Sequence, residues 1–344
     1  MNNFEGIIAN DDLCSYFVRS IKNNSLPHAF ILLGNRGSGK HTLARLVAAA
    51  LNCENKEEEG HPIPCLECAS CKKIMQNNSA DVITISREED RATLGVEPIR
   101  FIKEDVAFYP NDGDFKVYII EDAHTMTTQA QNAFLLTLEE PPSYAVFILL
   151  CEHSENILET IKSRAPILRM KAPKKEETIA YLKEKHPSAR SFINNHPEEF
   201  EQVYMASRGV IGRILELIDS KERKQLLQNR ELAARLIEAV ANRTLANDFG
   251  EISALFSQKR DEKEFVIMQL LEIQAAVRDL LVIKKADNAN LIFFTDVEYT
   301  ERLSYSFSTQ RLTEIAESAE KARLALLKNA NIKLTLTNFL SDLI

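Results

Sequence analysis

The stretch FILLGNRGSGKHT, residues 30–42, decides the fold of this chain. An apolar run, Phe30–Leu33, leads directly into the glycine-rich loop Gly34–Lys40, and a helical pattern follows as far as Asn52. A loop of this kind between a strand and a helix lets backbone N–H groups converge on phosphates, while its lysine reaches the β and γ oxygens. The positive end of the helix dipole adds to that attraction. The stretch therefore predicts a P-loop in an NTPase-type α/β domain.

The P-loop departs from its usual pattern at one position. The residues predicted to bind nucleotide are Gly34, Arg36, Gly37, Ser38, Gly39, Lys40, His41 and Thr42. The position after the lysine normally carries a serine or threonine whose hydroxyl holds Mg²⁺. Here it is His41, and Thr42 lies about 100° further round the helix, so its hydroxyl should point elsewhere. Binding of ATP through the loop backbone stays open, whereas efficient magnesium-dependent hydrolysis is not expected.

The second acidic motif shows a related change. The apolar run Val117–Ile120 predicts a strand that ends in Glu121 and Asp122. At this place an active NTPase has an aspartate for the metal, followed by a glutamate that activates water, and here the two acids stand in the reverse order. The alternative is that they are simply two solvated carboxylates at a strand end. Together with His41, the reversed order favours a degraded ATPase site.

The first half of the chain alternates strand and helix patterns. The predicted strands are residues 30–33, 82–85, 117–120, 145–150 and 167–168. The predicted helices between them are residues 41–52, a helix opened by Pro98, and residues 129–140. Strands that are apolar on both faces are typical of a parallel sheet covered by helices on each side. The sequence therefore predicts an α/β domain with a parallel five-stranded sheet.

Helical patterns replace the strands after residue 172. We predict three domains: an α/β domain over residues 1–172, a small helical domain over 173–222, and an all-α domain over 223–344. With 42 Lys+Arg against 50 Asp+Glu the formal charge is −8, which argues against a chain that binds DNA by itself through its overall charge. No secretory signal or membrane-spanning stretch is recognisable, so we expect a cytoplasmic protein without a membrane partner.

A cluster of cysteines follows the P-loop helix. Its members are Cys53, Cys65, Cys68 and Cys71. Four thiolates can close a tetrahedral zinc site, and short C-x-x-C turns bring pairs of sulfurs within bonding reach. Reduced cysteines and an iron–sulfur cluster are the alternatives. The pattern favours a structural Zn²⁺ in an irregular loop that contains Pro62 and Pro64.

Taken in this order, the motifs resemble those of the bacterial clamp-loader branch of the AAA+ ATPases. The resemblance also rests on His28–Phe30, on Asn132–Pro142 and on Thr160–Ala165, which looks like the family's Ser-Arg-Cys motif with Ala165 in place of cysteine. It implies an AAA+ domain, a helical lid and a C-terminal collar for the three predicted domains. In that family the arginine of the motif reaches the ATP site of a neighbouring subunit as a trans-acting finger, and here that residue is Arg164. The resemblance also implies that Arg213 lies on the second-sensor helix beside the nucleotide.

The resemblance implies a function within an assembly. The chain would be one subunit of a pentameric loader that opens the ring-shaped sliding clamp and seats it on primer–template DNA. Its partners would be the other loader subunits, the clamp and, through the assembled complex, DNA. The departures at His41, Glu121 and Asp122 favour a stator subunit with weak or no ATPase activity of its own. An autonomous ATPase of the motor type and a zinc-dependent nucleic-acid binder are the alternatives.

Overall fold

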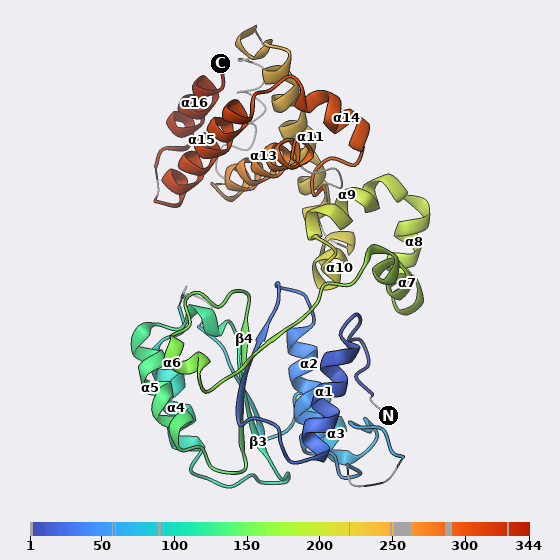
Figure 1. Ribbon diagram of the computed structural model, residues 1–344, viewed down its shortest axis with the longest axis vertical. Helices are drawn as coiled ribbons and strands as arrows, with labels where there is room; N and C mark the ends of the chain where they lie inside the picture. Colours follow the sequence, from blue (N-terminus) through green and yellow to red (C-terminus); the bar gives the residue numbers. More distant parts are fainter. Residues whose placement is uncertain are drawn as a thin grey trace. The chain divides into compact units, whose positions relative to one another are not determined.

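The chain forms two compact units in the computed structural model (Figure 1). The residues it describes are 3–344 apart from 57, 59, 89, 90, 92, 220, 248, 249, 251–262, 286–290 and 329. The first unit comprises Met1–Ala180 and Val210–Arg213, and the second comprises Tyr181–Gly209 and Ile214–Ile344. The domain boundaries at 172 and 222 stay a prediction.

A five-stranded parallel sheet organises the first unit. Its strands are β1 (Ala29–Leu33), β2 (Val82–Ile85), β3 (Lys116–Ile120), β4 (Ala145–Cys151) and β5 (Ile167–Arg169). Their order across the sheet is β2-β3-β4-β1-β5, and every neighbouring pair is parallel. All residues of β1, β3 and β4 are buried. Apart from Lys116 at the start of β3, these central strands are continuous apolar runs because both of their faces lie under helices.

Helices cover both faces of this sheet (Figure 1). One layer holds α1 (Asp11–Lys22), α2 (Lys40–Leu51) and α3 (Ala69–Met75); the other holds α4 (Val96–Asp105), α5 (Thr128–Glu139) and α6 (Glu159–Lys162). Alternate residues of β1 enter the two layers, since Phe30 packs with the α1 and α2 cluster and Ile31 with the α4 and α5 cluster. The predicted fold class is confirmed: an α/β domain with a parallel five-stranded sheet is followed by helices.

The described part of the chain after β5 is helical. Its elements are α7 (Lys175–Lys185), α8 (Pro187–Asn195), α9 (Pro197–Ser207), α10 (Ile211–Asp219), α11 (Lys221–Ala241), α13 (Lys263–Ile283), α14 (Val297–Ser304), α15 (Thr309–Leu327) and α16 (Ile332–Asp342). The core of the second unit includes Leu236 of α11, Ile273 of α13 and Leu312 of α15, all of them fully buried. This core explains the apolar periodicity of the second half of the sequence.

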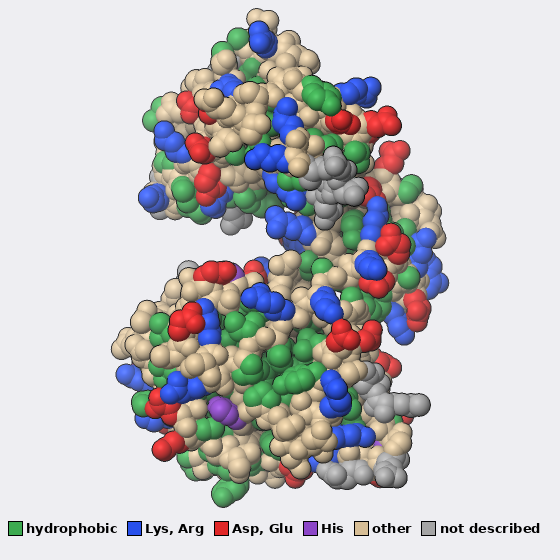
Figure 2. All heavy atoms as spheres, in the orientation of Figure 1, with side chains coloured by type: hydrophobic (Ala, Val, Ile, Leu, Met, Phe, Trp, Pro, Cys, Tyr) green, Lys and Arg blue, Asp and Glu red, His purple; other side chains and the backbone are tan. Residues whose placement is uncertain are grey.

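The surface carries charges of both signs. On the face shown in Figure 2, lysine and arginine side chains alternate with aspartate and glutamate over both units and do not gather into one basic patch. Within the described residues, no helix is long and apolar enough to span a bilayer. The arrangement on this face agrees with the acidic composition of the whole chain.

Candidate functional site

The predicted P-loop lies between the end of β1 and the start of α2. Gly37 and Gly39 have φ angles of 80° and 89°, in the left-handed region that glycine adopts at little cost. These conformations turn the chain tightly, so that the first turn of α2 begins at Lys40 and faces the loop. Of the other loop residues, Arg36 is exposed, and the Ser38 hydroxyl lies 3.9 Å from the sulfur of Met170. The loop is therefore built where the sequence predicted it.

The side chain of Lys40 folds back onto the loop backbone. Its Nζ donates to the carbonyl oxygens of Gly34, at 2.6 Å, and of Asn35, at 2.9 Å. Burial lowers the pKa of Lys40, and the negative charges of Glu152 and Asp122 oppose that shift. The ammonium group is thus held within the loop by two backbone carbonyl oxygens.

His41 and Glu121, the two sequence departures, are in direct contact. Nδ1 of His41 lies 3.0 Å from Oε1 of Glu121. The hydrogen bond from His41 lowers the pKa of Glu121, with burial opposing and Arg45 adding to the shift. Thr42, whose hydroxyl follows one position later, is exposed. The sequence singled out both members of this pair, but the pair itself is visible only in the structure.

Asp122, the second acid of the motif, lies beside an arginine. Its backbone is left-handed, with φ of 45°, and its Oδ2 lies 3.6 Å from Nε of Arg87. His124 follows on the next turn, with its ring centroid 4.3 Å from that of His153. Burial lowers the pKa of His124, and the neighbouring His153 adds to that shift. Arg87 and His153 were not recognised from the sequence because neither lies in a motif.

The segment that carries Arg213 touches the P-loop within the first unit. The N–H of Gly212 donates to the carbonyl of Gly37 at 3.2 Å. A Cβ atom on Gly212 would lie 2.9 Å from Cα of Gly37, and a Cβ on Gly37 would lie 3.1 Å from the backbone nitrogen of Arg213. The two backbones can approach this closely because both residues are glycine. The structure thus brings the backbone of Arg213 close to the loop through a glycine contact that the sequence did not predict. Nucleotide binding by Arg213 stays a prediction.

Arg164, the predicted finger, lies at the surface just after α6. One of its terminal nitrogens donates to Oε1 of Glu139 at 3.1 Å, and the other donates to the carbonyl of Thr160, also at 3.1 Å. The side chain of Arg164 is 36% exposed and that of Glu139 is 50% exposed. Ion pairs this exposed contribute about 0–1 kcal/mol, so a stronger anion can displace the glutamate.

Gln131 fixes the segment that leads to α6. Its side chain is buried, donates to the carbonyls of Met126 and Asn156, and accepts a hydrogen bond from the N–H of Leu158. These bonds join the start of α5 to the loop before α6. The position of Arg164 therefore depends on a buried amide that no sequence pattern identified as part of the site.

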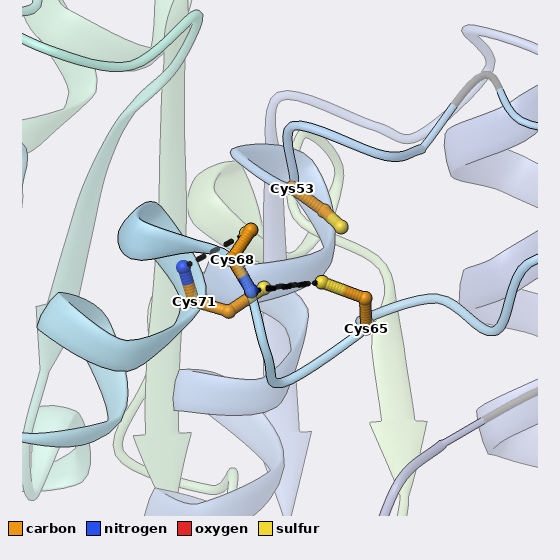
Figure 3. A group of neighbouring side chains, drawn as sticks. All are labelled: Cys53, Cys65, Cys68 and Cys71. Atoms are coloured by element: carbon orange, nitrogen blue, oxygen red, sulfur yellow. Dashed lines mark hydrogen bonds between the residues drawn. The ribbon is translucent and has the colours of Figure 1, made fainter.

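The four cysteines point towards one another (Figure 3). Cys53 follows α2, Cys65 lies in the connecting loop, Cys68 caps α3, and Cys71 lies within that helix. Their sulfurs all lie within 4.8 Å of one another. The predicted cluster is confirmed, although α3 forms part of it where the sequence suggested only an irregular loop.

The chemistry of this cluster suits a tetrahedral metal ion. With metal–sulfur bonds of about 2.3 Å, such a site places neighbouring sulfurs about 3.8 Å apart; those of Cys65 and Cys71 are 3.9 Å apart. Burial raises the pKa of the Cys65 thiol, but hydrogen bonds from the N–H groups of Cys68 and Glu67 outweigh it and lower the value to about 7. Burial raises the pKa of Cys53 and Cys71. A cation could draw all four into the thiolate form, so the cluster could bind a metal ion.

Comparison with known proteins links the first half of the chain to DNA polymerase III. Residues 9–174 match the family described as "DNA polymerase III, delta subunit". The tau subunit of DNA polymerase III from Bacillus subtilis is 37% identical over 161 residues, which are 47% of this chain and 28% of that protein. The gamma subunit from Buchnera aphidicola subsp. Schizaphis graminum is 36% identical over 172 residues, 49% of this chain and 46% of that protein. The chain thus spans less than half the length of these relatives.

Two solved structures align with most of the chain at low similarity. A gamma-subunit-related protein from Thermotoga maritima has a TM-score of 0.44 and 21% identity, covering 95% of this chain and 98% of that one. The DNA clamp loader delta protein of Bacillus subtilis has a TM-score of 0.36 and 16% identity, covering 96% and 98%. Residues 9–174 are thus similar to the delta, tau and gamma subunits of DNA polymerase III.

Proposed function

We propose that this chain is the delta-prime subunit of a bacterial clamp loader, a stator that supplies Arg164 to the ATP site of a neighbouring subunit. The observation that carries the proposal is the position of Arg164, whose side chain is partly exposed and whose ion pair is with an exposed glutamate. The relationship of residues 9–174 to clamp-loader subunits supports the same role. In the assembled loader, the chain would help to place the sliding clamp on primed DNA.

The exchange of one anion for another explains how Arg164 would act. A nucleotide γ-phosphate carries more negative charge than the carboxylate of Glu139 and would displace it from the guanidinium. During phosphoryl transfer, negative charge spreads over the phosphate oxygens, and an arginine supplied from outside stabilises it. Arg164 would therefore act after assembly, on chemistry that takes place in the adjacent subunit.

The chain's own P-loop would take no part in that chemistry. An active site needs a hydroxyl and a carboxylate that hold Mg²⁺ between them. In this chain, the corresponding positions are His41 and Glu121, which bond to each other. A P-loop that does not hydrolyse ATP suits a subunit whose role does not depend on its own nucleotide.

We propose that the four cysteines hold one structural Zn²⁺. A complete set of four thiolates leaves no position for substrate, so the ion would supply folding energy alone. Cys53 and Cys71 join the end of α2 to α3, and the ion would fix these helices to each other. Zinc fits better than hard cations such as magnesium, because thiolates are soft ligands.

The proposed partners follow from the clamp-loader relationship. They are the gamma/tau and delta subunits, the sliding clamp, and primer–template DNA met through the complete assembly in the cytoplasm. The formal charge of −8 supports contact with DNA in the assembly rather than alone. Residues 173–222 would serve as the lid and residues 223–344 as the collar.

The second candidate is an autonomous ATPase of the gamma/tau type. The similarity to the Bacillus subtilis tau subunit, 37% identity over 161 residues, favours it. The two candidates differ in the fate of ATP at the P-loop of this chain. A motor subunit would turn ATP over, and a stator would not.

We expect the purified chain to release phosphate from ATP at the background rate, with and without Mg²⁺. The reason is that the residue directly after Lys40 carries no hydroxyl and that Glu121 is bonded to His41. The measurement is steady-state phosphate release, with a Lys40→Ala variant purified in parallel to show any contaminating ATPase. Magnesium-dependent turnover that Lys40→Ala abolishes would reject the stator role and favour the gamma/tau-type motor.

A further inference from the structure

We propose that the His41–Glu121 pair occupies the place of Mg²⁺ at the P-loop and excludes that ion, so that the loop can take a nucleotide only in its metal-free form. His41 directly follows the P-loop lysine on α2, and Glu121 directly follows β3. These are the two protein positions that share the magnesium ion in P-loop NTPases. In this chain, each has become the hydrogen-bond partner of the other.

While His41 and Glu121 are bonded to each other, no ion fits between their two bonded atoms. Nδ1 of His41 and Oε1 of Glu121 are 3.0 Å apart, which is the length of a direct hydrogen bond. Magnesium needs near-octahedral oxygen ligands at about 2.0–2.1 Å and gives up its water molecules reluctantly. To admit it, the pair would have to break, and the imidazole would offer nitrogen where the ion prefers oxygen.

The charged side chains around the pair also disfavour the binding of a divalent cation. The carboxylate of Glu121 interacts with His41 and Arg45, which reduces its attraction for a cation. The adjacent Asp122 lies beside Arg87, with 3.6 Å between Oδ2 and Nε. The two acids that would attract a divalent ion therefore each face a basic side chain of this chain.

The test measures ADP binding by calorimetry to the complete chain, in excess Mg²⁺ and in excess chelator. For the natural chain, we expect affinities that agree within about twofold, or no binding under either condition. His41→Ser and His41→Thr supply the missing hydroxyl and release Glu121. We expect both variants to bind ADP at least about tenfold more tightly with Mg²⁺ than without it.

A matched control breaks a similar pair elsewhere. His196 and Glu199 lie 3.7 Å apart on the second unit, and His196→Ser should leave the magnesium response of ADP binding as it is in the natural chain. If the ADP affinity of the natural chain rises tenfold or more with Mg²⁺, the inference is wrong. It is also wrong if the His41→Ser and His41→Thr variants fold but bind ADP no more tightly with Mg²⁺ than without it. Using two substitutions guards against one of them failing to fold.

The exclusion of Mg²⁺ rests on the proposal that the chain's own P-loop does not hydrolyse ATP, but the experiments can reject the exclusion of Mg²⁺ and leave the stator role intact. Magnesium-dependent ADP binding without ATP turnover would reject the exclusion of the ion and leave the stator role intact. ATP turnover by the natural chain would reject both. The contribution of Arg164 to catalysis is measured separately, at the ATP site of the neighbouring subunit.

Discussion

Replacing Arg164 by alanine should lower ATP turnover at the neighbouring site of the assembled loader by about 10³-fold, the lower end of the range for arginine fingers. The variant chain should fold and assemble normally, because the guanidinium is exposed and its ion pair with Glu139 contributes about 0–1 kcal/mol. The measurement is DNA-stimulated phosphate release by a loader reconstituted with its partner subunits. Assembly is checked by size-exclusion chromatography.

Two further variants separate a finger from a general loss of positive charge. Arg164→Lys should also fail, because a lysine cannot present the planar pair of donors that an arginine offers to phosphate. Arg169→Ala removes a different exposed arginine of the same unit, at the end of β5, and should leave turnover unchanged. Normal turnover with Arg164→Ala in a fully assembled loader would reject the finger.

Replacing Cys65 and Cys68 together by serine should remove the metal ion from the chain. We expect metal analysis to find about one zinc ion per natural chain and about none in the variant, because hydroxyls are poor zinc ligands and two of four thiolates are lost. The free energy of metal binding is also folding free energy, so the melting temperature should fall by roughly 10 °C or more. Thermal unfolding by circular dichroism measures that change.

Cys14→Ser provides the matched control for this double variant. Cys14 is about as buried as Cys53 and Cys65, at 2% exposure, but lies on α1 outside the cluster. Its replacement should cost some stability by placing a hydroxyl in the core, and it should leave the zinc content unchanged. A natural chain purified without chelators that contains no zinc would contradict the proposed metal.

Local sequence patterns were sufficient to predict the sheet and the P-loop. The run Phe30–Leu33 is apolar on both faces because helices cover both faces of β1, and Gly37 and Gly39 are needed for left-handed turns. Such features depend on residues that are neighbours in the sequence. The spacing of the cysteines likewise predicted their cluster, since Cys65, Cys68 and Cys71 lie within one short segment.

The contacts between distant residues around the P-loop could not be predicted from local sequence patterns. His41 bonds to Glu121 and Gly37 packs against Gly212, across 80 and 175 positions of sequence. Such pairs depend on which strand ends and loops the fold brings together, and no local periodicity encodes that choice. The sequence showed that position 41 lacks its hydroxyl, but only the structure shows what the histidine does instead.

The most direct test of the central claim is a structure of the assembled loader with an ATP transition-state analogue. The account predicts that Arg164 has left Glu139 and donates hydrogen bonds of about 3 Å to the analogue in the adjacent subunit. It also predicts that His41 and Glu121 remain bonded, with no magnesium ion between them. An Arg164 still bound to Glu139, together with Mg²⁺ and nucleotide at the chain's own P-loop, would contradict it.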